Sequence, residues 1–393
     1  MTRRMLAPVL LLIAATSFAQ SPPQSPVVVE RIDIHTKRLR TETLISEMRL
    51  PKRASYTIDE IEQAIYRLRR LPFVVDATYT LDPGTAAGAR VLTINVVDET
   101  PVHVVLDIQG VAQKGGYVTT LTQIGWRFFP ARNGVAELNT GGASHFSGGG
   151  SGGPHLGDLS AQYTAYGLFG TSAFAGIGVS GHYQSEDRLV SPILLFGVPL
   201  TQTQTIRGTY SRTGVKSDSD GVATLQWLIE RNDDPYFARQ GFSAAAGPQW
   251  EKFRFIADYN GGKLHVDDTG NNVGFSVRGE KYWPLAEYGA YWVRGNATYL
   301  DEKTTNNGTK GRPSQLQLGD LLGGVGWNFD QWRTTGEWFD RWRPELGAGY
   351  HRDRQHQGAF VEDRSGLELF ASFAFRTRLG IFRLSLSRVN SKR

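Results

Sequence analysis

Two glycine-rich motifs have the spacing of nucleotide-binding or catalytic loops. Residues 176–181 read GIGVSG and fit G-x-G-x-x-G, which seats a pyrophosphate only where a strand precedes it and a helix follows. Residues 149–153 read GGSGG and fit the G-x-S-x-G nucleophile elbow, which must lie between a strand and a helix. The first motif lies inside a strand-like run and the second in a flexible glycine-rich stretch. We therefore expect neither a dinucleotide site nor a serine nucleophile.

The acidic and histidine residues are poorly spaced for a metal site. Asp218, Asp220 and Gly221 resemble part of a calcium-binding loop. When Gly221 is aligned with the glycine of that loop, the first and last positions of the loop lack carboxylates. His351 and His356 are more typical of strand rims than of ligand pairs. The chain has no cysteine, which excludes disulfides, thiolate zinc sites and cysteine nucleophiles. The sequence thus predicts no metal, no cofactor and no enzymatic activity.

Composition divides the chain into two parts near residue 101. Residues 21–101 contain two glycines, four aromatic residues and no tryptophan, whereas residues 102–393 contain 43 glycines, 39 aromatic residues and all nine tryptophans. Two such different compositions predict two domains. The formal net charge of +5 is spread thinly, with no basic block that would suit a nucleic acid. We therefore expect no nucleic-acid partner.

The N-terminus is typical of an export signal. Two arginines precede an apolar run over residues 5–15, and Ser17 and Ala19 have the spacing of a cleavage site. A membrane anchor is the alternative, but a helix needs about 20 apolar residues to span a bilayer. The sequence predicts a signal peptide over residues 1–19, a proline-rich linker over residues 20–26 and no transmembrane helix.

A small α+β domain is expected next. Its clearest helix begins with a T-x-x-E capping box at Thr57 and Glu60, followed by isoleucine and leucine at helical spacing. The predicted strands cover residues 27–35, 73–81 and 90–98, and the predicted helices cover residues 41–50 and 57–71. A three-stranded sheet with both helices on one face is the most economical packing of these elements.

The order of these elements and the closing sequence VVDETP resemble a POTRA (polypeptide-transport-associated) domain. Such domains usually close on V-x-E-x-P, which Val97, Glu99 and Pro101 match. Arg40 departs from the family, which often has a Gly-Asn turn there. The resemblance covers residues 27–101 and implies one periplasmic domain of this kind.

The second part of the chain alternates apolar and polar side chains over many short segments. In residues 290–299, Tyr291 and Val293 fall on one face, whereas Trp292 and Arg294 fall on the other. A secreted β-sandwich would bury the apolar face, whereas a membrane barrel turns it to lipid and the polar face to a wet lumen. Aromatic residues at strand ends and small residues within strands favour the barrel.

We therefore predict a mainly β fold, a transmembrane antiparallel β-barrel preceded by one small α+β domain. Sixteen strands would leave about 18 residues for each strand with its loop, so we expect about 16 strands over residues 102–393. Residues 139–158 and 301–314 are polar and glycine-rich and are predicted to be loops. The closing strand is expected over residues 381–389.

A POTRA-like domain before such a barrel resembles the BamA/TamA family of outer-membrane assembly proteins, also called bacterial surface antigens. A second match lies in residues 228–247, which look like the family segment D-x-R-D-x-P-x-F-P-T-x-G. The matching residues of this family-motif turn are Asp233, Pro235, Phe237 and Gly241. An ordinary turn between strands is the alternative, because proline and glycine are frequent in turns.

The family also carries a V/L-R-G-F/Y motif in a loop folded into the lumen, where its arginine pairs with acidic residues of the barrel wall. Two places in this chain are candidates for the lumen motif. Val277, Arg278 and Gly279 keep the Arg-Gly pair but lie within an apparent strand. Gly323 and Gly324 supply the glycine lead-in without an arginine. Neither motif is complete, so the arginine lock is altered or absent.

The resemblance implies an outer-membrane protein, with its N-terminal domain in the periplasm, that assists folding, insertion or translocation of client proteins. Its partners would be membrane lipid, unfolded outer-membrane or secreted clients, and accessory periplasmic proteins or lipoproteins. We expect a client to add a strand to the sheet edge of the N-terminal domain. The residues of this candidate edge are Phe73, Val74, Val75, Asp76, Ala77, Thr78, Tyr79 and Thr80. The seam between residues 102–110 and 381–389 is a second template for client strands.

Two other functions remain open. A two-partner-type secretion pore would pass an unfolded exoprotein through the lumen, but such proteins usually have two POTRA domains and a plug helix. A structural or porin-like barrel would need no POTRA-like domain.

Overall fold

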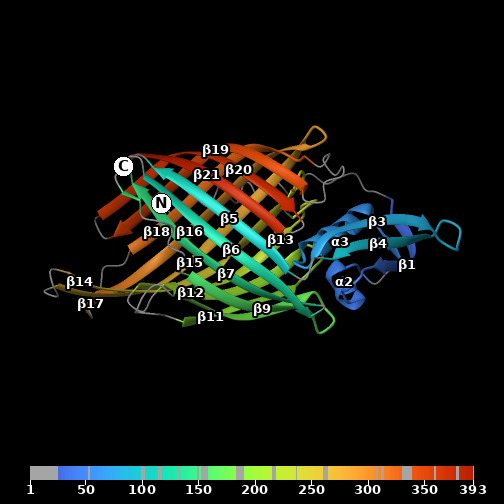
Figure 1. The fold of residues 1–393 in the computed structure, drawn as a ribbon, viewed down its shortest axis with the longest axis horizontal. Helices are drawn as coiled ribbons and strands as arrows, with labels where there is room; N and C mark the ends of the chain where they lie inside the picture. The colour runs from blue at the N-terminus through green and yellow to red at the C-terminus, as the bar shows by residue number, and fades with distance from the viewer. Residues whose placement is uncertain are drawn as a thin grey trace.

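The chain forms a small α+β unit followed by one large β-barrel, as a computed structural model shows (Figure 1). The structure describes residues 25–51, 54–98, 102–113, 117–131, 133–147, 150–151, 158–182, 190–214, 218–235, 237–259, 264–306, 309–310, 314–329, 339–357, 360–377 and 380–392. The predicted signal peptide, most of the linker, Glu99 and Pro101 lie outside these residues. No helix in the described ranges is both long and apolar enough to cross a membrane.

The N-terminal unit contains a mixed sheet in the order β2-β1-β4-β3. Its strands are β1 (Val27–His35), β2 (Ser55–Tyr56), β3 (Val74–Pro83) and β4 (Arg90–Asp98), and its helices are α2 (Thr41–Met48) and α3 (Ile58–Arg70). β1 runs parallel to β4, whereas β2 and β3 run antiparallel to their neighbours. The expected three-stranded sheet therefore has a fourth strand. β2 has two residues, too few to leave an alternating pattern in the sequence.

Helix α3 forms as its sequence predicts. Thr57 accepts a hydrogen bond from the Glu60 main-chain N–H at 3.2 Å, and the Glu60 carboxylate accepts one from the Thr57 N–H at 2.9 Å. Ile61, Ile65 and Leu68 point into the core and are almost fully buried. Burying each such side chain stabilises the fold by about 1.5–3 kcal/mol.

The barrel is one antiparallel meander that closes on itself. Its long strands are β5 (Val102–Gln113), β6 (Tyr117–Ala131), β7 (Gly134–Ser147), β9 (Asp158–Leu168), β10 (Ala173–His182), β11 (Val190–Pro199), β12 (Gln204–Gly214), β13 (Asp218–Glu230), β14 (Gly241–Tyr259), β15 (Leu264–Leu285), β16 (Gly289–Asn306), β18 (Ser314–Trp327), β19 (Phe339–Gln357), β20 (Phe360–Thr377) and β21 (Gly380–Lys392). Two-residue strands β8 (Gly150–Ser151) and β17 (Thr309–Lys310) extend the ladders of β7 and β16.

Counted over the described residues, the barrel has fifteen long strands rather than about sixteen. The estimate assumed equal strands, but β14 and β19 have 19 residues each and β15 has 22. Because these strands are longer than expected, the same number of residues forms fewer strands. Because each strand reverses direction, an odd count leaves the last strand parallel to the first, and β21 pairs with β5 in parallel.

Side chains alternate along the barrel wall as the sequence predicts. In β16, Tyr291 points outward and is about half exposed (49%), whereas Trp292 points into the barrel and is buried (1%). The predicted loop at residues 139–158 is partly wrong, since β7 continues to Ser147. β16 likewise continues to Asn306, inside the predicted loop at residues 301–314. Polar residues persist in these strands because one face of each points into the barrel.

Candidate functional site

Strand β3 forms the open edge of the N-terminal sheet. β4 pairs with one side of it, and no strand of the described chain pairs with the other side. An open edge presents main-chain N–H and C=O groups that can accept another strand. The candidate edge from Phe73 to Thr80 therefore has the required geometry from Val74 onward, while client capture there stays a prediction.

In the first half of this edge, main-chain groups are already hydrogen-bonded to side chains of the protein. The Ala77 N–H donates to the Asp76 carboxylate at 2.9 Å, and Arg69 Nε donates to the Ala77 carbonyl at 3.0 Å. Arg69 also pairs with Asp76 at 2.9 Å. The Val75 carbonyl accepts from Arg376 Nη1 of the barrel at 2.7 Å. A client strand would therefore find the free part of the edge beyond these three residues.

Phe73 is not an edge residue, contrary to the sequence prediction. It precedes β3 and is 3% exposed. Its ring makes edge-to-face contacts with Phe129 and Tyr166 of the barrel, with centroids 6.5 and 5.6 Å apart. Tyr166 in turn stacks on Phe174. These aromatic contacts make the core of the N-terminal unit continuous with the barrel end.

Arginines on the two helices of the N-terminal unit hold it against the barrel. Arg49 donates to the Thr201 and Gln204 carbonyls at 3.2 and 3.3 Å. Arg67 donates to the Gln202 carbonyl at 2.6 Å, and Arg70 pairs with Glu230. The acceptors lie in the turn between β11 and β12 and at the end of β13. Figure 1 shows the unit at the barrel end opposite the C-terminus.

Arg49 adopts a backbone conformation that is unusual for its residue type. It ends α2 with φ of 52°, in the left-handed region where glycine is common. A non-glycine residue pays a steric penalty there, and such strain persists where surrounding contacts enforce it. Arg49 therefore both ends α2 and contacts the barrel turn.

A carboxylate lies beside these arginines. Burial raises the pKa of Glu47 to about 7, although Arg49, Arg70 and Arg67 act to lower it. Burial also lowers the pKa of Arg67, and the nearby Arg49 lowers it further. The two shifts have one cause, which is removal of charged groups from water. The docking interface is therefore sensitive to protonation of Glu47.

The family-motif turn folds into the barrel at the end where the N-terminal unit docks. The Asp233 carboxylate accepts hydrogen bonds from the N–H groups of Arg239 and Gln240 at 2.9 and 3.2 Å. Gly241 has φ of 109°, and a Cβ there would collide with the Arg231 carbonyl. Pro235 lies within the turn, in the stretch that the Asp233 bonds close. Asp233 and Gly241 of the motif therefore shape the turn.

Phe237 of this turn is buried and anchored by residues that come from β19 and from the segment after β18. Its ring lies under the Arg341 guanidinium, 5.5 Å from the centroid, and its carbonyl accepts from Asn328 at 2.8 Å. Arg341 also pairs with Asp234 at 2.7 Å. Arg343 donates to the Ala238 carbonyl. Residues from β19 and the end of β18 thereby fix a turn between β13 and β14.

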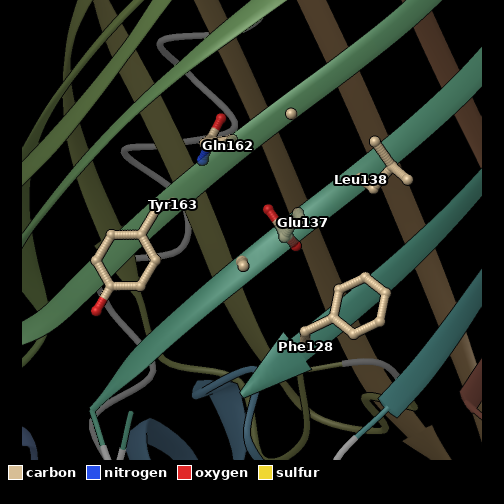
Figure 2. A pocket seen from close by; sticks show the side chains of 7 residues that line it. Phe128, Glu137, Leu138, Gln162 and Tyr163 are labelled. Carbon is tan, nitrogen blue, oxygen red and sulfur yellow. The ribbon is translucent and has the colours of Figure 1, made fainter. Parts of the chain in front are cut away.

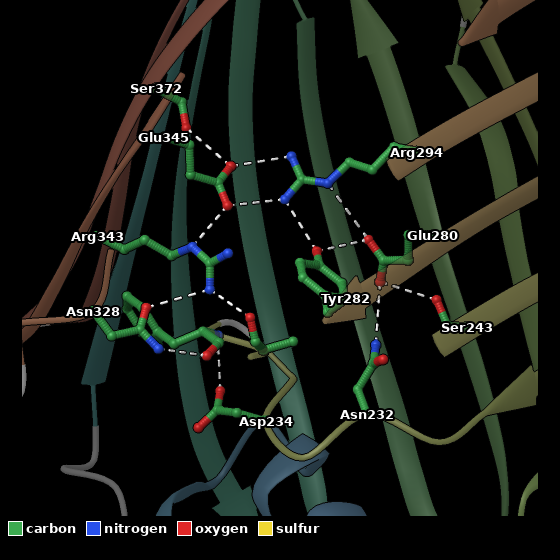
Figure 3. A network of polar contacts seen from close by, with 12 residues as sticks. Asn232, Asp234, Ser243, Glu280, Tyr282, Arg294, Asn328, Arg343, Glu345 and Ser372 are labelled. Atoms are coloured by element: carbon green, nitrogen blue, oxygen red, sulfur yellow. Dashed lines mark hydrogen bonds and ion pairs between the residues drawn. The ribbon is translucent and has the colours of Figure 1, made fainter. Parts of the chain in front are cut away.

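A polar network lies above this turn, on neighbouring strands of the barrel wall (Figure 3). Arg294 makes two hydrogen bonds to the Glu345 carboxylate at 3.0 and 3.1 Å, and Arg343 pairs with the same carboxylate at 2.8 Å. Arg294 also donates to the Tyr282 hydroxyl at 3.0 Å, which donates to Glu280. Arg343 is 2% exposed in its side chain and Glu345 is 8% exposed. The network ties β15 and β16 to β19 over the intervening strand β18.

In the second candidate lumen motif, Gly324 packs against the side chain of Trp292. A Cβ on Gly324 would collide with the Trp292 ring, and one on Gly347 would lie 2.7 Å from it. Arg294 stacks on the other side of the ring, 4.3 Å from its centroid. Gly323, the neighbour of Gly324, meets only ordinary contacts at 3.7 Å. Gly324 therefore leaves space for a tryptophan from the facing strand.

Neither candidate lumen motif lies in a loop. Val277, Arg278 and Gly279 are inside β15, and Gly323 and Gly324 are inside β18. Arg294 and Arg343, which come from strands and which the sequence motifs did not indicate, pair with the acidic Glu345 of the barrel wall. The period-two alternation of β16 had placed Arg294 on the polar face. Its partner Glu345 lies on a strand 51 residues away, which no local pattern indicates.

The other motifs lie in regular strands. Residues 176–181 are part of β10, and the Asp218–Gly221 segment is part of β13, so neither forms a phosphate or calcium loop. Gly150 and Ser151 of the G-x-S-x-G-like motif form β8. The other three residues of this motif, at positions 149, 152 and 153, lie outside the described residues. His351 bonds to Asp320 across β18 and β19. Within the described ranges, no group of three histidine or acidic residues could hold a metal ion.

A shallow apolar groove of about 360 Å³ lies on the outer wall (Figure 2). Phe128, Leu138 and Tyr163 form its rims, and Ala136 and Ala161 leave the space between them. The three larger side chains are exposed, so the groove opens away from the lumen. Its walls suit a hydrocarbon chain rather than a polar substrate.

Comparisons with known proteins give distant structural matches. No protein-family model matches the chain, and no curated protein matches it. The chain is similar to the crystal structure of BamA from Haemophilus ducreyi lacking POTRA domains 1–3, with 10% identity and a TM-score of 0.33 over 93% of this chain and 82% of that one. It is also similar to CdiB from Escherichia coli, with 13% identity and a TM-score of 0.32 over 89% of this chain and 72% of that one.

Proposed function

We propose that the chain is an outer-membrane protein that assists folding, insertion or translocation of client proteins, with its POTRA-like unit in the periplasm. The observation that carries this proposal is the position of β3. Arg376 of β20 binds Val75 of β3, and Arg376 pairs in register with Ile381 of β21. The open sheet edge therefore begins beside the point where the barrel closes.

The outer wall supports a membrane location. Its large apolar side chains are exposed along most strands, an arrangement that is unfavourable in water and favourable in lipid. Examples are Leu159, Ile177, Leu194, Phe196, Trp227, Trp250, Phe275, Tyr291, Leu346, Leu367, Leu384 and Leu386. The inner wall carries the ion pairs and hydrogen bonds described above, as a wet lumen allows.

Client capture would use main-chain hydrogen bonds. Groups on an edge strand alternate between those that face the neighbouring strand and those that face outward. The Ala77 N–H and C=O are bonded by side chains of Asp76 and Arg69, so they belong to the outward set. Tyr79 and Leu81, at spacings of two and four, belong to the same set. An extended client would pair with β3 from Tyr79 onward.

The test uses the full-length protein in liposomes beside protein-free liposomes. The folding of a small unfolded barrel protein is timed by gel shift, and ion conductance is recorded in parallel. The proposal predicts faster client folding in liposomes that contain the protein. Unchanged client folding with large, steady conductance would instead support a secretion pore or a porin-like barrel and would contradict the proposal.

A further inference from the structure

Two arginines on the inner wall of the barrel have no acidic partner among the described residues. Arg207 lies in β12, and Arg278 lies in β15 within the first candidate lumen motif. We call them the lumen arginine pair. Neither side chain makes an ion pair or a hydrogen bond to another described residue, and the Nε of Arg207 is buried. A buried donor without an acceptor is unfavourable, so Arg207 is ready to donate to an anion.

Both members of the lumen arginine pair point into the barrel. Trp227 of β13 is exposed on the outer wall (44%), so Gln226 beside it points inward, and Arg207 is its register partner on β12. On β15, Phe275 is exposed on the outer wall, and Arg278 stands at an odd spacing from it and points inward. Arg278 is also exposed, so water and small solutes in the lumen reach its guanidinium.

A hydrogen bond along the inner wall links the neighbours of the two arginines. Gln226 Nε2 donates to Ser276 Oγ at 3.2 Å, which joins β13 to β15 over the intervening β14. The bond passes Gly247, the register partner of Ser276, where a Cβ would lie 2.9 Å from the Gln226 Cα. Arg207 lies beside Gln226 at one end of this row. Arg278 lies two residues from Ser276 at the other end, on the same face of β15.

The carboxylates near the lumen arginine pair are engaged by other arginines. Glu230 of β13 pairs with Arg70 of the N-terminal unit. Glu280 lies two residues from Arg278 on β15, but its carboxylate contacts Arg294 at 3.7 Å and accepts hydrogen bonds from neighbouring side chains. Each glutamate therefore has an arginine of its own. The lumen arginine pair adds two positive charges that the described carboxylates do not balance.

This excess charge favours an anion with two negative charges. Among the neighbouring charged groups, Arg278 acts most strongly on Arg207, followed by Arg70, and both repel it. Like charges held together in a partly enclosed site attract an opposite charge. Guanidinium groups offer paired donors that match the oxygen atoms of phosphate. A phosphate monoester carries nearly two negative charges above its second pKa of about 6, which balances two arginines.

We infer that the lumen arginine pair, Arg207 and Arg278, binds a phosphate dianion, either free or as the monoester of a small water-soluble molecule. The Ser276 hydroxyl accepts from Gln226, so its own proton can be donated to a phosphate oxygen. A membrane lipid is not the source of this phosphate, because the site faces the lumen and not the bilayer. The inference goes beyond the proposed function, and its readout is not client folding.

Ligand-linked stability tests the inference in the full-length protein, folded in detergent micelles. Urea unfolding followed by gel shift is measured at about pH 8, above the second pKa of phosphate. Sodium phosphate and sodium glycerol 3-phosphate are each compared with sodium chloride at equal ionic strength. A ligand that binds only the folded state raises the unfolding midpoint once its concentration exceeds its Kd. The difference from chloride is compared between variants, so a change in intrinsic stability is subtracted.

Substitutions assign the response to the two arginines. Arg207→Gln and Arg278→Gln each remove one charge of the pair and should weaken the Kd for phosphate by about tenfold or more. Arg278→Lys keeps the charge without the paired donors and should recover part of the response. Arg388→Gln is the matched control, because Arg388 is exposed on the same face of β21 as the exposed outer-wall residue Leu386. This control should respond to phosphate as the wild type does.

The inference is supported if both glutamine variants lose the response to phosphate and Arg388→Gln keeps it. A response to both anions identifies a monoester ligand, and a response to inorganic phosphate alone identifies free phosphate. The inference is wrong if phosphate does not stabilise the wild type. It is equally wrong if phosphate stabilises all variants alike, since phosphate raises the stability of many proteins by its exclusion from their surface.

Discussion

The guanidinium of Arg376 donates a hydrogen bond of 2.7 Å to the carbonyl of Val75, a residue 301 positions earlier in the chain. Arg376 is 7% exposed and lies near the end of β20, whereas Val75 lies at the start of the edge strand β3. This bond joins the N-terminal sheet edge directly to the strand beside the barrel seam, whereas Arg49, Arg67 and Arg70 bind the unit to β12, β13 and the turn before β12. Its loss should therefore loosen the sheet edge beside the seam while the other docking contacts remain.

Replacing Arg376 should loosen the contact between the edge strand β3 and the barrel seam. Arg376→Gln removes a charged donor, which is expected to weaken docking by about 1.5–3 kcal/mol and to slow client folding in liposomes. Arg376→Lys keeps the charge and should restore part of the rate. Arg388→Gln is the control, since Arg388 is exposed on β21. Equal rates for Arg376→Gln and Arg388→Gln would show that the bond has no role in assembly.

Blocking the outward groups of β3 should impair client capture. Tyr79→Pro removes one outward N–H, and proline is tolerated on an edge strand. Tyr79→Leu keeps that N–H and an apolar side chain, so it controls for loss of the ring, which packs partly in the core. Client folding should slow for the proline variant alone, with helical circular dichroism confirming that both variants are folded. Matching rates would argue that β3 does not hold the client.

Docking of the N-terminal unit should weaken as pH rises. The pKa of Glu47 is about 7 in the docked structure against an ordinary value of 4.5, so burial of this carboxylate in the folded, docked protein takes up a proton. The contribution of Glu47 to docking is complete below pH 4.5 and is lost as pH rises through about 7. Spin labels at Thr80→Cys and Thr171→Cys would report the docked fraction by their separation. Glu47→Gln should abolish the pH dependence, and a pH dependence that survives this change would assign it to another group.

Position 324, where glycine leaves space for the Trp292 ring, should tolerate no side chain. Gly324→Ala places a Cβ against the Leu346 carbonyl and the Trp292 ring, and overpacking of this kind is expected to destabilise the barrel by about 1–3 kcal/mol. Gly323→Ala on the same strand meets atoms at 3.7 Å and should be nearly neutral. Urea unfolding followed by gel shift measures both variants. A neutral Gly324→Ala would mean that both the Trp292 ring and the facing main chain of β19 have room to move.

Glu345 should be the critical carboxylate of the lumen network. Glu345→Gln leaves Arg343 and Arg294 without their shared counter-charge, and breaking a buried pair in this way costs about 3–5 kcal/mol. Glu137→Gln breaks the more exposed pair with Arg127, for which a loss of about 0–1 kcal/mol is expected. Unfolding midpoints in urea would compare the two. Similar losses would show that the network at Glu345 is well hydrated.

Local spacing accounts for most of the fold that the sequence predicted. The capping box at Thr57 and Glu60, the helical run that follows it and the alternation around Trp292 depend on residues a few positions apart. Such patterns survive in any tertiary context that buries one face. The glycine-rich segments were harder to assign, since polar residues that face a lumen look the same in sequence as polar residues in a loop.

By itself, the sequence determined an α+β unit followed by a β-barrel with an apolar outer wall, because periodicity is written in neighbouring residues. Only the tertiary structure decided the odd strand count, the parallel seam, the pairing of Arg294 with Glu345 and the docking of Val75 on Arg376. Each of these depends on strand lengths and on contacts between distant segments. These contacts form only when the barrel closes, because each strand then pairs with two neighbouring strands and each buried charge pairs with a partner.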